Sequence, residues 1–220
     1  DNRVAGDTLS ATYSTASFAD KNVGAARTVS VSGITISGAD AANYTANATA
    51  NTTADITARA LVVSATGVNK VYDGTTSASV TLSDNRMAGD TLTASYSSAS
   101  FADKNVGSGK SINVSGITLT GTDAANYTAN TTATATADIT ARSLTVSATG
   151  VNKVYDGPTS ATVTLSDNRV AGDSLSDSYT SATFANKNVG SGKTVSVSGV
   201  SVSGTDAGNY TINTTAATTA

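Results

Sequence analysis

The sequence lacks most of the side chains on which catalysis and covalent cross-linking depend. Its 220 residues contain no Cys, His or Trp, and all 16 acidic residues are Asp. Without Cys, no disulfide can form. Without His, Cys or Glu, the usual acid–base pairs and activated nucleophiles are absent. We therefore expect a protein that is not an enzyme and that needs no cofactor.

Charge and long hydrophobic runs are also scarce. The formal net charge is −3 and charged residues make up 13% of the chain. Such a chain does not attract nucleic acid, and a disordered tail would carry more charge. No apolar run approaches the roughly 20 residues of a membrane helix, and no signal peptide is visible. We expect no membrane insertion in this segment. Because the sequence begins in the middle of a pattern, we expect it to be a piece of a longer protein.

The main positive feature is a tandem repeat. The block DNRVAGD at Asp1 returns as DNRMAGD at Asp84 and as DNRVAGD at Asp167, so both steps are 83 residues. This period is too long for a solenoid rung and suits one small β-sandwich domain. The predicted domains are residues 1–58, a partial repeat that lacks its first strands, residues 59–141, a complete repeat, and residues 142–220, a nearly complete repeat.

Alternation of apolar and small polar residues predicts strands in every repeat. In SASVTLS (77–83), Val80 and Leu82 share one face and Ser and Thr occupy the other. Short strands with one buried face need a second sheet to cover that face. We therefore predict an all-β protein made of tandem immunoglobulin-like antiparallel β-sandwich domains. The junction TADITARALVV contains no Gly or Pro, so we expect the domains to form an elongated rod.

One tyrosine per repeat favours the immunoglobulin-like prediction. The blocks DAANYT and DAGNYT contain Tyr44, Tyr127 and Tyr210. Their pattern is typical of the tyrosine corner, in which the hydroxyl group bonds back to the backbone at a strand entry. We predict a structural role for these three tyrosines.

Several separated blocks match a known family in order and at fixed spacing. KVYDGTTSASVTLSDNRMAGD, FADKNVGSGKSINVSGITLTGTDAANYTA and ADITAR resemble the YDG domain, a bacterial immunoglobulin-like repeat. The resemblance covers both later repeats almost whole and the last two-thirds of the first. It implies stalk repeats of a large secreted adhesin of the filamentous-haemagglutinin-like kind, located at the bacterial cell surface or in the extracellular matrix. It brings no catalytic residues. The third repeat departs from the pattern at Pro158 and Asn186.

The YDG block itself is open to two interpretations, a ligand site or a turn. Asp-Gly is a strong turn signal, and the flanking alternation needs no chemistry to explain it. We therefore predict a structural turn. Its residues are Tyr72, Asp73 and Gly74 in the second repeat and Tyr155, Asp156 and Gly157 in the third.

Four other kinds of site remain as alternatives. Asp84, Asn85 and Asp90 offer oxygen ligands that suit Ca²⁺, although the same residues also satisfy turns. An internal isopeptide bond would involve Lys70, Lys104 or Asp103. The row of Thr132, Thr134 and Thr136 is compatible with an ice-binding face or with a solvent-facing strand. Glycosylation sequons begin at Asn43, Asn47, Asn51, Asn113, Asn126, Asn130, Asn209 and Asn213.

We expect these repeats to act as structural stalk or fibre modules that project a distal adhesive region. Their expected partners are the neighbouring repeats of the chain, with a host or matrix receptor bound through other regions. One alternative is a multivalent binding module for a glycan, host protein or matrix polymer, because near-identical copies also provide avidity. Another is a strand-exchange fibre-assembly unit, because a repeat without its first strands leaves a sheet edge for another chain to pair with.

Overall fold

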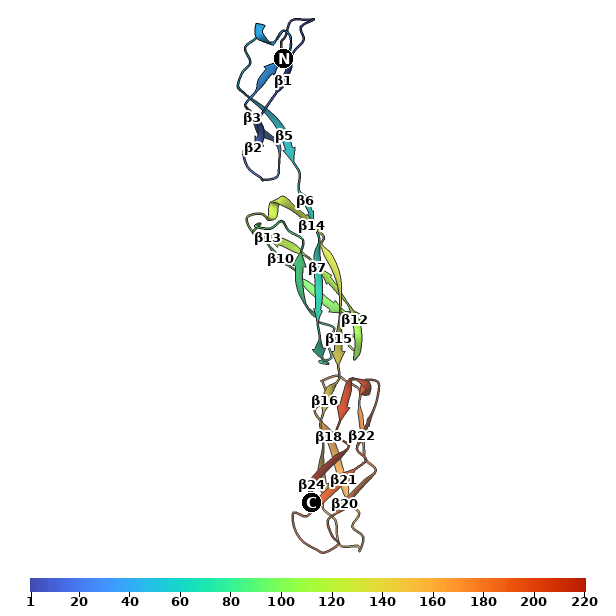
Figure 1. Ribbon diagram of the computed structural model, residues 1–220. Coiled ribbons are helices and arrows are strands. Elements are labelled where there is room, and N and C mark those ends of the chain that lie inside the picture. The colour runs from blue at the N-terminus through green and yellow to red at the C-terminus, as the bar shows by residue number, and fades with distance from the viewer. The chain divides into compact units, whose positions relative to one another are not determined.

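The computed structural model describes residues 1–220 and contains strands, three short 3-10 turns and no α-helix (Figure 1). The all-β prediction is confirmed. No helix is long and apolar enough to span a membrane. The chain divides into two compact units, one formed by residues 1–63, 84–95 and 118–130, the other by residues 64–83, 96–117 and 131–220. We describe each unit separately.

The first unit combines the whole first repeat with one end of the second. Its elements are β1 (Ser10–Thr12), β2 (Thr15–Phe18), β3 (Gly24–Ser32), β4 (Thr35–Ser37), η1 (Ala41–Asn43), β5 (Thr49–Ile56), β6 (Arg59–Leu61), β10 (Thr93–Ser95), β13 (Thr118–Thr120), η2 (Ala124–Asn126) and β14 (Tyr127–Ala129). β2, β3 and β5 form one antiparallel sheet, while β1 pairs with β4 and β10 pairs with β13. β6 and β14 pair in parallel.

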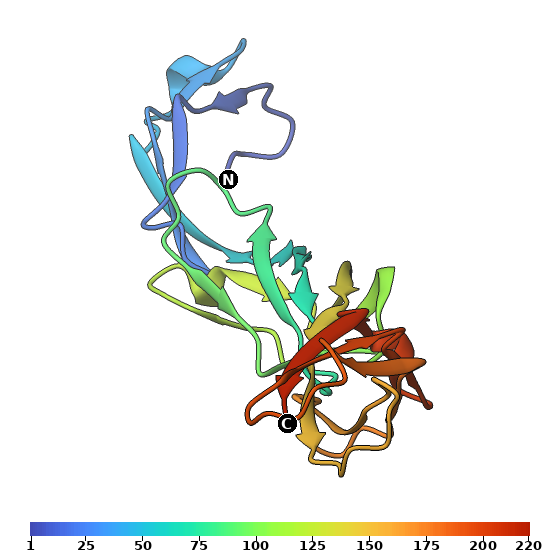
Figure 2. The ribbon, with the colours of Figure 1, turned by 90° about the horizontal axis from the view of Figure 1, so that it is seen from below.

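The second unit combines the rest of the second repeat with the third. Its elements are β7 (Val63–Val68), β8 (Lys70–Val71), β9 (Ser79–Asp84), β11 (Ser98–Phe101), β12 (Gly107–Ser115), β15 (Thr132–Thr140), β16 (Arg142–Leu144), β17 (Val146–Val151), β18 (Thr162–Asp167), β19 (Ser176–Ser178), β20 (Ser181–Phe184), β21 (Thr194–Ser198), β22 (Ser201–Ser203), η3 (Ala207–Asn209), β23 (Tyr210–Ile212) and β24 (Thr215–Thr219). The first residue of β7, Val63, and the last residue of β9, Asp84, belong to the first unit. β24 lies beside β21 near the C-terminus (Figure 2). The largest sheet has the order β11-β12-β15-β8.

Strand pairing differs from the purely antiparallel prediction in three places. β6 with β14, β16 with β23, and β8 with β15 are parallel pairs. In the first two pairs, the opening strand of a repeat and the strand that follows its 3-10 turn start at the same end of the repeat, so they run in the same direction. The four-stranded sheet is therefore mixed, and the other two parallel pairs are separate two-stranded sheets. Alternation alone could not reveal this because it reports faces and not directions.

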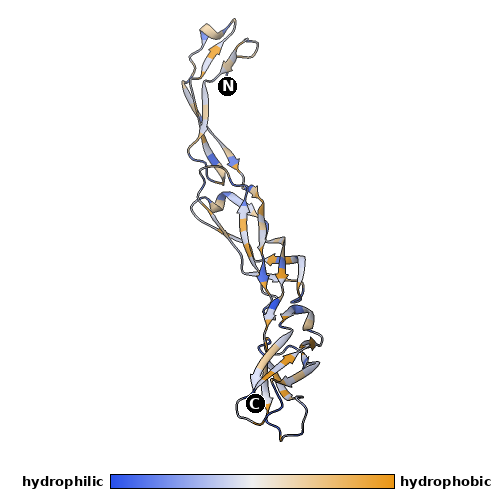
Figure 3. Cartoon of the chain, turned by 60° about the horizontal axis from the view of Figure 1, so that its bottom comes forward, coloured by the Kyte–Doolittle hydropathy of each residue, from blue (hydrophilic) through white to orange (hydrophobic).

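The core is built from the alternating positions that the sequence indicates. Ile112 and Val114 on β12 are buried, as are Val195 and Val197 on β21. Asn113 and Ser196, which lie between them, are exposed. Figure 3 shows hydrophobic positions distributed along the strands instead of forming long runs. On β15 the Thr132, Thr134 and Thr136 row lies on the exposed face. Small residues on the outer faces leave each sheet with one apolar side.

Gly116 explains the sharp turn between β12 and β13. Its φ is +67°, a left-handed conformation that favours glycine. An added Cβ would lie 1.9 Å from Oγ of Ser97. The turn at this position therefore depends on the absence of a side chain.

Candidate functional site

Each repeat contains a hydrogen-bonded Tyr–Asp pair at its loop DNRxAGD. The hydroxyl groups of Tyr44, Tyr127 and Tyr210 each donate to an Asp that lies 37 positions earlier, at 2.5 Å. Each hydroxyl oxygen also accepts the backbone N–H of a residue 40 positions earlier, at 2.8–2.9 Å. This is the backbone bond that a tyrosine corner makes. The two bonds of each tyrosine hold the loop DNRxAGD in place and orient the side chain of its last Asp, which is Asp7, Asp90 or Asp173.

A second Asp stands beside the first in every repeat. Asp123, at the start of η2, accepts the backbone N–H of Thr91 at 2.8 Å, and Asp206 accepts that of Ser174 at 3.0 Å. In the first repeat, Asp40 accepts the N–H of Thr8 at 2.8 Å. These bonds tie the 3-10 turn to the loop DNRxAGD, so the two carboxylates are held on one end of the repeat.

A lysine from the preceding repeat bridges these two carboxylates. Lys21 Nζ lies 2.6 Å from Asp90 and 2.7 Å from Asp123. In the next repeat, Lys104 Nζ lies 2.9 Å from Asp173 and 2.9 Å from Asp206. The same pairing thus occurs twice in one chain. We call the contacts between residues 1–58 and 59–141 the first junction, and those between residues 59–141 and 142–220 the second junction.

The ion pairs keep both partners charged. Hydrogen bonding to Asp123 and then Asp90 raises the pKa of Lys21, and Lys21 in turn lowers the pKa of both carboxyl groups. Hydrogen bonding to Asp206 and then Asp173 likewise raises the pKa of Lys104. At neutral pH each junction therefore contains a stable ammonium between two carboxylates.

An asparagine provides a second contact across each junction. The Oδ1 atom of Asn126 accepts the backbone N–H of Val23 at 2.9 Å, and the Oδ1 atom of Asn209 accepts that of Val106 at 2.9 Å. Their amide groups also reach Asn22 and Asn105 at 3.3 Å. Because these bonds use the backbone, they fix how the loop KNVG of one repeat meets the 3-10 turn of the next.

The second junction contains a further residue, Tyr72 of the YDG block. Its side chain is 1% exposed. Its hydroxyl group bonds to both oxygens of Asp173, at 2.9 and 3.0 Å, and its ring meets Tyr210 edge-on with centroids 5.4 Å apart. Lys104 Nζ lies 5.7 Å from the ring centroid. The tyrosine therefore covers the ion pair and also donates to it.

Burial and hydrogen bonding compete at this covered carboxylate. Burial raises the pKa of Asp173, but hydrogen bonds from Tyr210, Lys104 and Tyr72 outweigh burial and lower the pKa overall. Burial and the bond to Asp173 raise the pKa of Tyr210 to about 12. Asp173 is thus held as a carboxylate with donors on three sides.

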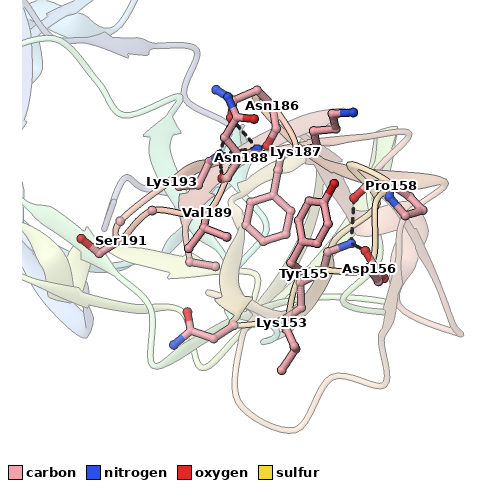
Figure 4. A pocket seen from close by; sticks show the side chains of 16 residues that line it. Lys153, Tyr155, Asp156, Pro158, Asn186, Lys187, Asn188, Val189, Ser191 and Lys193 are labelled. Carbon is pink, nitrogen blue, oxygen red and sulfur yellow. Dashed lines mark hydrogen bonds and ion pairs between the residues drawn. The ribbon is translucent and has the colours of Figure 1, made fainter.

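The rest of the YDG block forms a local turn in both copies. Lys70 Nζ contacts Asp73 at 2.8 Å and the carbonyl oxygens of Thr75 and Ser77 at 2.8 and 2.9 Å. Gly74 has φ +79°, a conformation that favours glycine. In the third repeat, Lys153 contacts Asp156 at 2.7 Å and the carbonyl groups of Pro158 and Ser160 at 2.9 Å (Figure 4), and Gly157 has φ +99°. In the second repeat the N–H of Thr75 also donates to Asp73 at 2.9 Å, a bond that Pro158 cannot make, whereas the lysine contacts to the two carbonyl groups are kept.

The two tyrosines of the YDG blocks have different environments. Tyr72 is buried at the second junction, whereas Tyr155 is 58% exposed. The block is therefore a turn that also positions a junction residue.

The calcium candidates are engaged by neighbouring protein groups. Asp84 forms an ion pair with Arg86, Asn85 accepts the N–H of Val62 at 2.8 Å, and Asp90 binds Tyr127 and Lys21. No group of three or more Asp side chains is arranged to hold a metal ion. These residues act here as turn and junction residues.

The isopeptide candidates also have ionic partners. Lys70 pairs with Asp73, Lys104 with Asp173 and Asp206, and Asp103 with Lys110 at 2.5 Å. A charged ammonium is not a nucleophile, and the pKa of Lys104 is raised. Asn186, which replaces Asp103 in the third repeat, still contacts the corresponding lysine, Lys193, through its backbone oxygen at 3.0 Å.

Sequence reasoning missed the residues that join the repeats. Lys21, Asp123, Asp173 and Asp206 are not among the predicted site residues, and Asn126 and Asn209 are named only as glycosylation sequons. The available signal was the recurrence of the blocks ADKNVG, AGD and DAANY at the repeat spacing. Recurrence marked them as important to the module without indicating that one block contacts another in the next repeat.

Comparison with known families gives one match, which occurs three times. The YDG domain matches residues 1–54, 57–136 and 140–219. A search of curated proteins and a search of solved structures found no match. The match covers nearly the whole chain in three consecutive stretches, and the junction contacts described above join one stretch to the next. The chain therefore belongs to the YDG-domain family and consists of three YDG domains in tandem.

Proposed function

We propose that this chain is part of the stalk of a large secreted bacterial adhesin of the filamentous-haemagglutinin-like kind, located at the cell surface or in a biofilm matrix. Its three YDG domains are immunoglobulin-like sandwiches joined end to end as a rod. The rod projects a distal adhesive region and transmits force between that region and the cell. The role is mechanical and not catalytic.

The repeated junction is the observation that supports this function. A lysine bridging two carboxylates and an asparagine accepting a backbone N–H occur at both junctions. A chain of independent binding modules would not need the same contacts between every pair of neighbours. In a tandem array, stability is close to a sum of domain terms and nearest-neighbour terms, so a repeated contact stiffens the array at every step.

The linkers support the same function. β5 ends at Ile56 and β6 begins at Arg59, while β15 ends at Thr140 and β16 begins at Arg142. Two residues and one residue, respectively, separate these strands, and none of them is Gly or Pro. Such short connections restrict bending far more than a Gly/Ser tether does, so tension on one domain passes directly into the next.

Small-angle X-ray scattering of the 220-residue chain tests the proposal. We expect an extended particle whose maximum dimension is unchanged between low and moderate salt. The double variant Lys21→Ala, Lys104→Ala removes both bridging lysines and should give a more flexible particle with a broader distance distribution. Lys187→Ala, which changes the corresponding exposed lysine of the third repeat, serves as the matched control. Scattering typical of freely jointed beads from the unmodified chain would contradict the proposal.

A further inference from the structure

One buried acidic side chain of the third repeat has no counterpart in the other two. Asp177, on β19, stands where the first and second repeats have Ala11 and Ala94. It pairs with Val202 of β22, as Ala94 of β10 pairs with a residue of β13. The side chain of Asp177 is only 8% exposed. Because the paired strands around this position are the same in the second and third repeats, the carboxyl group is what distinguishes the third.

Asp177 lies beside an ion pair that is already complete. Asp167, whose side chain is 1% exposed, accepts hydrogen bonds from Nε of Arg169 at 2.8 Å and from its Nη2. The third nitrogen, Nη1, donates to the carbonyl oxygen of Leu175 at 2.6 Å. Nη2 lies 3.7 Å from Asp177, which is too far for a hydrogen bond. One guanidinium group, with every nitrogen engaged, therefore faces two carboxyl groups.

The second carboxyl group lacks a donor of its own. The Oδ1 atom of Asp177 is buried and has no hydrogen-bond partner. Leaving a buried acceptor unpaired costs free energy, and leaving a buried charge unpaired costs more. A proton on Asp177 lowers both costs, because the neutral acid can donate its O–H to Asp167 and no longer repels it. Burial and then hydrogen bonding with Asp167 raise the pKa of Asp177, whereas hydrogen bonding with Arg169 lowers the pKa of Asp167.

We propose that Asp177 and Asp167 share one proton in the folded third repeat, and that this acid pair makes the third repeat a pH-sensitive element of the array. When Asp177 loses the proton, two buried carboxylates repel each other across a single guanidinium group. The charged groups that face Asp177 are Asp167 at the end of β18 and Arg169 in the loop after it. Tyr179 lines the same groove, and its hydroxyl group bonds to the N–H of Val163 at 3.5 Å. This inference goes beyond the stalk function, in which the three domains are equivalent.

The effect on stability has a definite sign. The pKa of Asp177 is raised from 3.8 in the folded protein, so the folded third repeat holds this proton more tightly than the unfolded chain does. The stabilisation is therefore fully present below pH 3.8 and is lost as the pH rises through the folded pKa. Each unit of difference between the two pKa values changes the unfolding equilibrium constant up to about tenfold. The third repeat thus becomes less stable when acidic surroundings turn neutral.

Carboxyl carbon NMR of the full chain between pH 2 and 8 tests the shared proton directly. We expect Cγ of Asp177 to titrate above pH 3.8 and Cγ of Asp167 to titrate below it, with each signal also sensing the other step. In Asp177→Asn, which keeps a neutral donor beside Asp167, the second step should vanish. Titration of Asp177 at or below pH 3.8 overturns the proposal.

Hydrogen exchange measures the consequence for stability, with the second repeat as internal reference. From pH 4 to 7, the protection of amides in β18 and β21 should be lost relative to that in β9 and β12. Asp177→Asn and Asp177→Ala should both abolish this loss, and the alanine variant is expected to fold because the other repeats have alanine there. Ala94→Asp places the same group beside Asp84 and Arg86 and should transfer the loss to the second repeat. A protection ratio that is independent of pH in the unmodified chain, or a loss that persists in Asp177→Ala, overturns the proposal.

Discussion

The first and second junctions use the same lysine and asparagine contacts but differ in burial. The bridging lysine side chain is 61% exposed at the first junction and 34% exposed at the second. The first carboxylate it contacts, Asp90 or Asp173, is 13% exposed in one case and 2% in the other. The sequence difference is the YDG block, which residues 1–58 do not contain. At the second junction Tyr72 of this block is buried and donates to both oxygens of Asp173.

The first and second repeats also differ in the exposure of a corresponding phenylalanine. Phe18 in the first repeat is 39% exposed, whereas Phe101 in the second is 3% exposed. Phe101 lies 5.7 Å from Lys70 Nζ, and the N–H of Phe101 bonds to the carbonyl group of Thr76. The YDG turn thus covers its own repeat and contributes to the junction with the next one. The motif couples the stability of a domain to the stability of its contact with a neighbour.

The largest expected effect comes from removing that tyrosine. Tyr72→Ala should lower the free energy of unfolding by about 3–5 kcal/mol, because it deletes a buried aromatic ring and a donor to Asp173. Tyr155→Ala, at the corresponding exposed position, should change it by less than roughly 0.5 kcal/mol. Urea unfolding of the full chain measures both. Equal effects would mean that the second junction adds nothing to the tyrosine's contribution.

Acidification should weaken both junctions together. The pKa values of Asp90, Asp123, Asp173 and Asp206 are lowered from 3.8 in the folded protein. Their contribution is therefore present above pH 3.8 and is lost as the pH falls through the folded values. With Asp177→Asn to remove the opposite effect of Asp177, thermal unfolding should be constant between about pH 5 and 8 and decline below about pH 4. The Lys21→Met, Lys104→Met variant should show a shallower decline, and an unchanged decline would assign the effect to other carboxyl groups.

Removing one lysine at a time compares the two junctions directly. Lys104→Met should lower the urea midpoint more than Lys21→Met, because the change leaves Asp173 charged and buried while Asp90 stays accessible to water. Methionine retains most of the aliphatic stem, so packing is kept in both variants. Measuring the difference at low and high salt tests the cause, since salt should erase most of the Lys21 effect and less of the Lys104 effect.

How much of this comparison the sequence predicts depends on distance along the chain. The alternation around Val80 and Leu82 predicts strands, and the recurrence of Tyr127 predicts a structural residue, because both signals are local or periodic. The Lys21–Asp90 contact joins residues 69 positions apart in different repeats. Nothing in the local pattern selects Asp90 over another Asp. The folded loop must first bring Asp90 and Asp123 together before a bridging lysine becomes recognisable.

The asparagines form a graded series. The side chain of Asn43 is exposed, Asn126 is partly buried, and Asn209 is 4% exposed. Asn209→Ala should cost about 1–2 kcal/mol, because it leaves the N–H of Val106 without its acceptor away from water. Asn126→Ala should cost less, and Asn43→Ala should have almost no effect. Hydrogen exchange at the amides of Val23 and Val106 reports each bond separately, and equal exchange rates in the unmodified chain would remove the proposed gradient.

The smallest expected difference between corresponding positions concerns the glycine of the YDG turn. Gly74→Ala and Gly157→Ala both place a side chain at positive φ, which costs about 1 kcal/mol in each case. At Gly74 the new Cβ would also lie 2.7 Å from Cγ1 of Val170, across the second junction, whereas at Gly157 nothing lies within 4 Å. Gly74→Ala should therefore be the more destabilising by up to about 1 kcal/mol, since Val170 has to move. Adding Val170→Ala relieves the contact and should reduce the difference between the two glycine variants. If the difference persists, the junction does not pack against the turn as closely as the Gly74–Val170 distance indicates.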